Sequence, residues 1–399
     1  MSKFPITVLL CVLTLAATPF IRAETTPSVE ERLQRIEKAL ARLEEHLNYK
    51  VSSEALAPTL KEYGELKHQL GWDGKSPITV VKPAGKEKSL SVGGFVQLQG
   101  EAGDAPDSRF NGINDRFLIR RARLNIKGTF AEHFDFALQS EFGNNAISGV
   151  SGYRLQATDV FVNWSKYEKA NITIGQFKTP FGYEQLLSDT KVLFIERSLP
   201  NDLLTFGRQA GVAASGSFVN KRITYSAGIF NGNGSNSGNN DNDQFMYVAR
   251  TGVVAWSAKP GKLVFGIDGA QSRDTGTTFT GERTAWSADS QFTYGPLDFA
   301  AEYFRQHLDR NSGTDTSADG WYAQAGWYLP GRKWQLLARY ETYDPNTALS
   351  HDDSHDWTMG ASYYLKGDDL KFSLNYILGD PAGPLDSEGR LLGRFQIIY

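Results

Sequence analysis

The sequence predicts a transmembrane β-barrel of sixteen antiparallel strands that follows a short N-terminal helix. From Leu90 to Tyr399 the apolar residues recur with a period of two, which is typical of strands with one apolar and one polar face. The connections between these segments alternate between short turns and long polar loops, as in transmembrane barrels. Aromatic residues make up 12% of the chain, which also contains 39 glycines. Beyond the N-terminus no apolar run approaches the roughly 18 residues that would indicate a spanning helix.

Residues 1–23 predict a cleavable secretory signal. Lys3 precedes an apolar run from Pro5 to Ala17, and the small Ala23 is the expected residue before the cleavage point. The only cysteine, Cys11, lies in this apolar run. The mature chain is therefore expected to contain no disulfide, thiolate nucleophile or thiolate metal ligand.

Residues 24–50 predict a periplasmic coiled-coil segment. Its apolar residues are spaced alternately by four and three, in the order Val29, Leu33, Ile36, Leu40, Leu43 and Leu47. This is the heptad repeat of a coiled coil, and a helix this short is marginal alone. We therefore expect three chains to share the seam, with an amphipathic helix packed on its own domain as the alternative. Residues 51–89, which include three prolines, predict a linker.

The barrel is predicted to occupy residues 90–399. Its expected strands are 90–102, 115–129, 132–143, 155–165, 170–178, 209–219, 222–230, 245–257, 262–273, 282–294, 297–309, 319–329, 333–343, 355–366, 369–379 and 389–399. Tryptophans at the strand ends predict the aromatic girdles of a membrane barrel: Trp164, Trp256, Trp321, Trp327 and Trp357.

The connection at residues 179–208 differs from all others. It spans roughly 30 residues, too long for an ordinary connection in a compact domain. It is rich in Phe, Leu and Ile, unlike a solvated linker. We expect this third loop to fold into the barrel and to narrow a water-filled channel.

Four segments resemble the phosphate-selective porin O and P family of Gram-negative outer membranes. They are Phe117–Gly128 (FLIRRARLNIKG), Ile174–Gly182 (IGQFKTPFG), Phe194–Gly211 (FIERSLPNDLLTFGRQAG) and Ile229–Gly234 (IFNGNG). The resemblance extends from about residue 90 to the C-terminus. It implies a trimeric barrel of sixteen strands with an inward third loop and a bias toward anions.

Alternation on the second predicted strand directs three cations toward the lumen: Arg121, Arg123 and Lys127. Arg120 falls on the lipid-facing parity, so it either extends to the interface, lies at a subunit contact, or is turned inward by a bulge. The family resemblance implies that Arg120 and Arg121 act together. The alternative for this group is a set of basic residues solvated near a strand end.

Four more cations lie on or beside the third loop: Lys178, Lys191, Arg197 and Arg208. The direction of Lys178 is undecided, because Pro180 and Gly182 end its strand. Arg197 follows Glu196, so an ion pair that fixes the loop is as good an interpretation as a pore-lining role. With the cations of the second strand, these residues form the predicted site for anions.

The charge balance predicts a modest anion preference. Alternation also directs many acids into the lumen: Asp135, Glu141, Asp159, Asp268, Asp289, Asp298, Glu302 and Glu341. We expect a homotrimeric outer-membrane channel for passive diffusion of small hydrophilic solutes, with a phosphate- or polyphosphate-type preference and its N-terminal helix in the periplasm. The alternatives are a general or sugar pore, or a barrel that mainly tethers the envelope.

Catalysis and nucleic-acid binding are not predicted. Residues His351–His355 form a loop with two histidines, which would hold a divalent cation weakly or simply be solvated. No catalytic constellation or cofactor motif is recognisable, and the net charge of −3 gives no support to nucleic-acid binding. The expected partners are therefore small solutes, outer-membrane lipid and two further copies of the chain.

Overall fold

The computed structural model describes residues 79–81, 89–144, 146–147, 152–276, 279–380 and 388–399. The predicted signal segment, the coiled-coil segment and most of the predicted linker lie outside these residues. No helix in the described ranges is long and apolar enough to cross a membrane.

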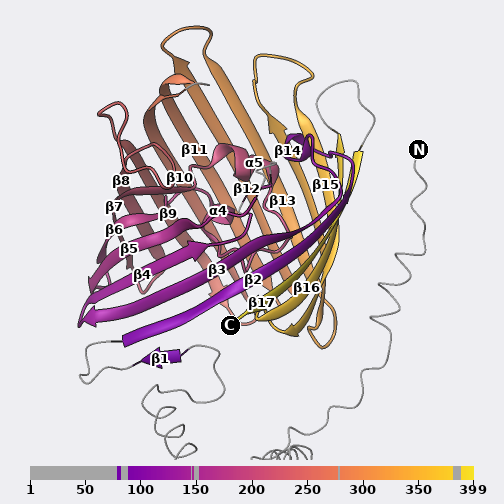
Figure 1. Cartoon of the computed structure of the whole chain (residues 1–399), viewed down its shortest axis with the longest axis horizontal. Helices are drawn as coiled ribbons and strands as arrows, with labels where there is room; N and C mark the ends of the chain where they lie inside the picture. Colours follow the sequence, from indigo (N-terminus) through magenta and orange to yellow (C-terminus); the bar gives the residue numbers. More distant parts are fainter. Residues whose placement is uncertain (1–78, 82–88, 145, 148–151, 277–278, 381–387) are drawn as a thin grey trace, which may run out of the picture. The chain divides into compact units, whose positions relative to one another are not determined.

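Sixteen strands of the described part, β2 to β17, form a closed antiparallel barrel (Figure 1), as the sequence predicts. The ring closes where β17 pairs with β2, from Arg390 opposite Gly103 to Ile398 opposite Phe95. Closure pairs the edges of the sheet, which a membrane barrel requires because lipid offers no hydrogen-bonding groups. The first eight strands are β2 (Ser89–Gly103), β3 (Arg116–Ala131), β4 (Phe134–Glu141), β5 (Gln156–Tyr167), β6 (Ala170–Lys178), β7 (Arg208–Phe218), β8 (Ile223–Phe230) and β9 (Met246–Ala258). The second eight are β10 (Gly261–Thr275), β11 (Thr280–Tyr294), β12 (Leu297–Arg310), β13 (Thr316–Tyr328), β14 (Trp334–Asp344), β15 (Ser354–Lys366), β16 (Leu370–Asp380) and β17 (Glu388–Ile398).

One additional strand lies within the predicted linker. β1 (Thr79–Val81) pairs with β2, with Thr79 opposite Val92 and Val81 opposite Leu90. β17 pairs with β2 only as far as Phe95. β1 therefore covers part of the edge of β2 that β17 leaves open.

Side chains alternate across the barrel wall. On β11, Trp286 is 43% exposed on the outer face, whereas Ser287 and Asp289 are buried on the inner face. The outer face also carries Ile174, Ile267, Leu336 and other large apolar residues, which suit a lipid environment. Polar side chains thus gather in the lumen, where the third loop meets them.

The third loop, residues 179–207, lies inside the ring of strands (Figure 1) and contains the short helices α4 (Tyr183–Leu186) and α5 (Leu199–Leu204). Ser198 caps α5, with its hydroxyl accepting a hydrogen bond from the Asn201 N–H. Phe181 and Leu204 are almost fully buried and pack with Phe304 from β12 in an apolar cluster. These apolar contacts give the loop a folded position within the lumen.

The first loop, residues 104–115, also enters the barrel. Its 3-10 turn η1 (Ser108–Phe110) places Phe110, which is fully buried, in a second apolar cluster with Ile195 of the third loop and Leu392 of β17. The two loops therefore contact each other on the long-loop side of the barrel.

Candidate pore constriction

A β-bulge turns two neighbouring arginines into the lumen. Gln97 of β2 pairs with Arg121 of β3, but the next residue, Leu98, pairs with Ile119, so Arg120 is the extra residue. Arg120 and Arg121 are only 3% and 5% exposed. Of the three interpretations of Arg120, the structure therefore shows the bulge.

The wall arginines bind the carboxylates of the third loop. Arg120 Nε lies 2.8 Å from Glu196 Oε1, and Arg394 Nη2 of β17 lies 2.7 Å from the same oxygen. Arg123 binds both Glu141 of β4 and Asp189 of the loop. Strands β3 and β17 are thereby joined to the loop by buried ion pairs.

Asp189 is the loop carboxylate at the centre of this cluster. It is 4% exposed, and burial opposes its ionisation, but the guanidinium groups of Arg123, Arg197 and Arg121 hold its pKa well below the ordinary value. Arg197 Nη1 lies 2.6 Å from Asp189 Oδ1, so its ion pair is with Asp189. The predicted pairing of Arg197 within the loop is present, although its partner is not the neighbouring Glu196.

Positive charge exceeds negative charge in this basic cluster, which we define as five guanidinium groups facing three carboxylates in the described structure. Its members are Arg120, Arg121, Arg123, Arg197 and Arg394 with Glu141, Asp189 and Glu196. Arg121 has the weakest pairing, because its nearest carboxylate oxygen, on Asp189, is 3.5 Å away. Its Nε is buried without a hydrogen-bond partner in the described structure. The cluster therefore keeps a positive field.

The opposite wall holds the loop through backbone amides. The N–H of Gly182 donates to Asp268 of β10 at 2.8 Å, and that of Tyr183 donates to Glu302 of β12 at 2.7 Å. The N–H of Leu199 donates to Glu341 of β14, also at 2.8 Å. The loop is thus fixed between a basic wall on one side and an acidic wall on the other.

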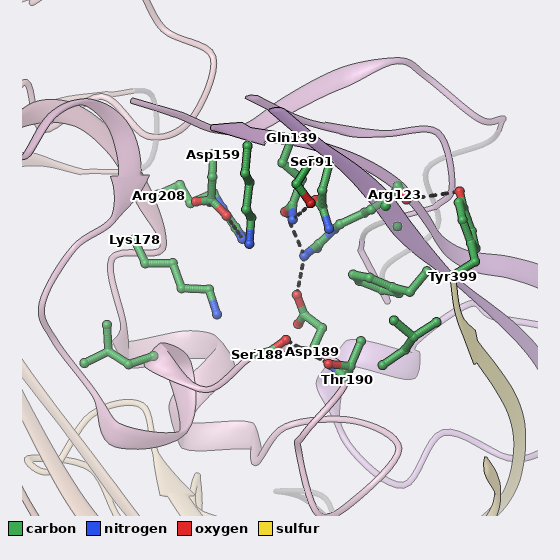
Figure 2. Close-up of a pocket in the computed structure, with 17 residues that line it drawn as sticks. Ser91, Arg123, Gln139, Asp159, Lys178, Ser188, Asp189, Thr190, Arg208 and Tyr399 are labelled. Carbon is green, nitrogen blue, oxygen red and sulfur yellow. Dashed lines mark hydrogen bonds and ion pairs between the residues drawn. The ribbon is translucent and has the colours of Figure 1, made fainter. Parts of the chain in front are cut away.

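Two cavities border the basic cluster. The first, about 380 Å³ (Figure 2), opens toward the short-turn end beside Ser91 and Tyr399. The second, about 620 Å³, opens toward the long loops. Both are lined by Arg123, Asp189 and Arg208. A path that joined the two cavities would pass these three side chains.

Lys178 and Arg208 reach this path from adjacent strands. Arg208 Nε lies 2.9 Å from Asp159 Oδ1, so its charge is balanced. The Lys178 ammonium group donates to the carbonyl oxygens of Gln185 and Leu187 at 2.7 and 2.6 Å. These acceptors are neutral main-chain groups, and within the described structure Lys178 forms no ion pair; its side chain lies beside the path (Figure 2).

Lys191 lies apart from the other predicted cations. It is exposed and lines a separate cavity of about 330 Å³ with Lys262 and Asp298. The other six predicted residues gather at the basic wall. Sequence reasoning missed Asp189, although the third loop contains four acids beside its cations: Glu184, Asp189, Glu196 and Asp202.

Known proteins share this sequence pattern and this fold. A family model described as phosphate-selective porin O and P matches residues 92–382. Porin O of Pseudomonas aeruginosa is 24% identical over 343 residues, which cover 74% of this chain and 76% of that protein. The anion-selective porin from Comamonas acidovorans is similar in fold, with a TM-score of 0.56 and 11% identity over 78% of this chain and 100% of its own. The outer-membrane protein OmpT of Vibrio cholerae has a TM-score of 0.57 and 12% identity, over 80% and 100% of the two chains.

Proposed function

The chain belongs to the phosphate-selective porin O and P family of outer-membrane porins, and we propose that it passes small hydrophilic solutes with a modest preference for anions. One observation carries this proposal. The two cavities on either side of the third loop share Arg123, Asp189 and Arg208, and Lys178 lies beside the first of them. A solute that crosses the barrel here moves along a positive wall.

The preference is modest because most cations of the wall are engaged. Asp189 and Glu196 neutralise part of the basic cluster, and Asp159 neutralises Arg208. The remaining positive charge raises the local concentration of anions in a narrow, low-dielectric frame. Phosphate-type anions fit this chemistry because guanidinium and ammonium groups donate hydrogen bonds to their oxygens.

Assembly as a homotrimer is part of the proposal. A solved structure of OmpT of Vibrio cholerae, which has a similar fold, is described as a trimer form. In the present chain we assign the heptad seam of residues 24–50 to a periplasmic helix that associates with its copies. Deletion of this segment should weaken the trimer in chemical cross-linking while leaving a heat-modifiable barrel on gels. Unchanged trimer strength would refute this role.

The reversal potential across a planar bilayer with a salt gradient tests the anion preference. Wild type should give an anion-selective potential, and Lys178→Gln should move it toward cations. The control is Lys221→Gln. Lys221 is an exposed cation in the turn between β7 and β8 and is paired with Glu168. The difference should shrink in 1 M salt, where the Debye length is about 3 Å.

Three results would decide against this proposal. A cation-selective wild type would exclude the anion preference outright. Equal potentials for wild type and Lys178→Gln at low salt would remove Lys178 from the selective path. A near-zero potential for both would identify a general pore, and sugar permeation in liposome swelling would then distinguish a sugar pore.

A further inference from the structure

Asp356 is a buried acid that the described structure leaves without a donor. It lies near the long-loop end of β15 and is fully buried. Neither of its carboxylate oxygens accepts a hydrogen bond in the described structure. An ionised carboxylate in this position would be strongly destabilised, because nothing replaces the water it loses.

The neighbouring strand increases the free-energy cost of ionising Asp356. Glu341 of β14 lies directly opposite Asp356, and like charges in directly opposed positions repel. Glu341 is also fully buried, and it accepts from Arg339 Nη2 and from the Leu199 N–H. Arg339 is turned toward the third loop, where it donates to the carbonyl oxygen of Glu196. The guanidinium group of Arg339 on β14 therefore already binds other acceptors.

The first loop brings another acid and another engaged cation. Asp107 is buried and binds Arg109 through both of its oxygens. Arg109 also binds Asp202 at 2.8 Å and the carbonyl oxygen of Arg197. The guanidinium groups of Arg109 and Arg339 thus serve other partners, and in the described structure neither forms a hydrogen bond with Asp356.

Gly379 of β16 shows where the first loop meets Asp356. The two residues pair across the strands. A Cβ atom added at Gly379 would overlap the carbonyl oxygen of Pro106 and come within 2.6 Å of Asp356 Oδ1. The bare Cα of the glycine therefore lets a main-chain oxygen of the first loop approach the carboxyl group of Asp356. Both oxygens lie beside Gly379, and a carboxyl group binds a carbonyl oxygen only when it carries a hydrogen.

We propose that Asp356 carries a proton in the folded barrel and that its neutral carboxyl group keeps the first loop docked in the lumen. A protonated carboxyl group supplies the missing O–H donor, with the Pro106 carbonyl oxygen as the acceptor beside it. It also removes one negative charge from the group formed with Glu341 and Asp107. Loss of the proton at alkaline pH places a third carboxylate among them and releases the loop.

The released loop would alter the outer mouth of the pore. Ser108 and Arg109 of the first loop line the cavity that opens toward the long loops. Their displacement would widen this mouth, so single-channel conductance should rise at alkaline pH. This effect is separate from anion preference, and its failure would leave the proposed selectivity intact.

The main test compares wild type with Asp356→Asn over a range of pH. The amide imitates the neutral carboxyl group and cannot ionise. A proton held in the folded state and lost in the unfolded state makes stability fall as pH rises, so the unfolding temperature of wild type should fall toward alkaline pH. Asp356→Asn should lose that part of the dependence and should not show the alkaline rise in conductance. The control is Asp353→Asn, which removes a half-exposed acid paired with His355 in the neighbouring loop.

Infrared spectroscopy provides a direct reading that does not depend on the stability of a variant. Wild type at neutral pH should show a carbonyl band of a protonated carboxylic acid, and the band should be weaker in Asp356→Asn. An unchanged band would overturn the proposal, as would the same pH dependence in both proteins. Stabilisation by added calcium at fixed pH, present in wild type and absent in Asp356→Asn, would assign the site to a metal ion and would also overturn it.

Discussion

Arg197 forms its ion pair with Asp189, eight residues earlier in the same loop, whereas the adjacent Glu196 binds Arg120 and Arg394 on the barrel wall. The two loop carboxylates therefore have different structural roles. Asp189 joins two segments of the loop to each other and to Arg123. Glu196 fastens the loop to strands β3 and β17. The position of the constriction depends on both.

Asp189→Asn should increase anion selectivity and loosen the third loop. The substitution removes the carboxylate that pairs with Arg197 and one of the two carboxylates described for Arg123. Breaking a buried ion pair typically lowers stability by about 3–5 kcal/mol. Here the loss should destabilise mainly the folded position of the third loop. The expected result is a reversal potential shifted toward anions with noisier single-channel currents. Glu132→Gln, at an exposed turn position, is the control, and equal current noise in the two variants would contradict the anchoring role.

Conductance and selectivity should not respond to acid until the pH is well below the usual carboxylate range. Burial opposes ionisation of Glu196, but Arg120, Arg394 and Arg121 hold its pKa well below the ordinary value, as for Asp189. A depressed folded-state pKa contributes stability above the unfolded value, about 4, and this stability is lost as pH falls through the folded value. Conductance and selectivity should therefore be constant from pH 7 to about 4. A transition centred near pH 6 would show that the loop carboxylates are not held in this way.

Gly379→Ala should displace the first loop. The added methyl group would overlap the Pro106 carbonyl oxygen, which belongs to the backbone and has little freedom to move aside. Overpacking of this kind costs about 1–3 kcal/mol. Hydrogen exchange in residues 104–115 should become faster, and the unfolding temperature should fall. In Gly393→Ala on β17 the nearest atom would be 3.8 Å from the new methyl group, so this control should behave as wild type.

Arg120 and Glu196 should be energetically coupled. A double-mutant cycle with Arg120→Gln and Glu196→Gln should give a coupling energy in the upper part of the usual range of roughly 0.5–3 kcal/mol, since both side chains are buried. The matched pair is Lys221 with Glu168, whose side chains are 75% and 63% exposed, and its coupling should be about 0–1 kcal/mol. Reversible denaturant unfolding in detergent provides both values. Equal coupling in the two cycles would show that the Arg120–Glu196 ion pair does not hold the third loop against the barrel wall.

The strands could be predicted because their signal is local. Alternation within each segment reflects two different surroundings, lipid and lumen, and it needs no knowledge of the partner strand. The strand β6 begins and ends at the predicted residues, and the others differ by a few residues at their ends. The same local rule failed for Arg120, because a bulge depends on the register with β2, which alternation within β3 does not contain.

The partners of the charged residues could not be predicted for a related reason. Arg123 and Asp189 are 66 residues apart, and Arg394 and Glu196 are 198 apart. Alternation directs Arg394 into the lumen, but only the fold of the third loop decides which carboxylate it meets. Six of the seven predicted cations lie around the basic cluster and Lys191 lies apart, whereas the part that several of them play in holding the loop is visible only in the structure.

The bulge in β3 also restricts how this strand can change in length during evolution. On one side of it Arg121 and Arg123 face inward, and on the other side Arg120 and Leu118 do, while Phe117 is 95% exposed. Deleting a single residue at the bulge would exchange the two faces of residues 116–119, bringing Phe117 into the lumen and Leu118 into the lipid. Homologues should therefore vary freely in the loops at either end of β3, whereas an alignment gap within 117–123 should be rare and accompanied by a compensating change in β2.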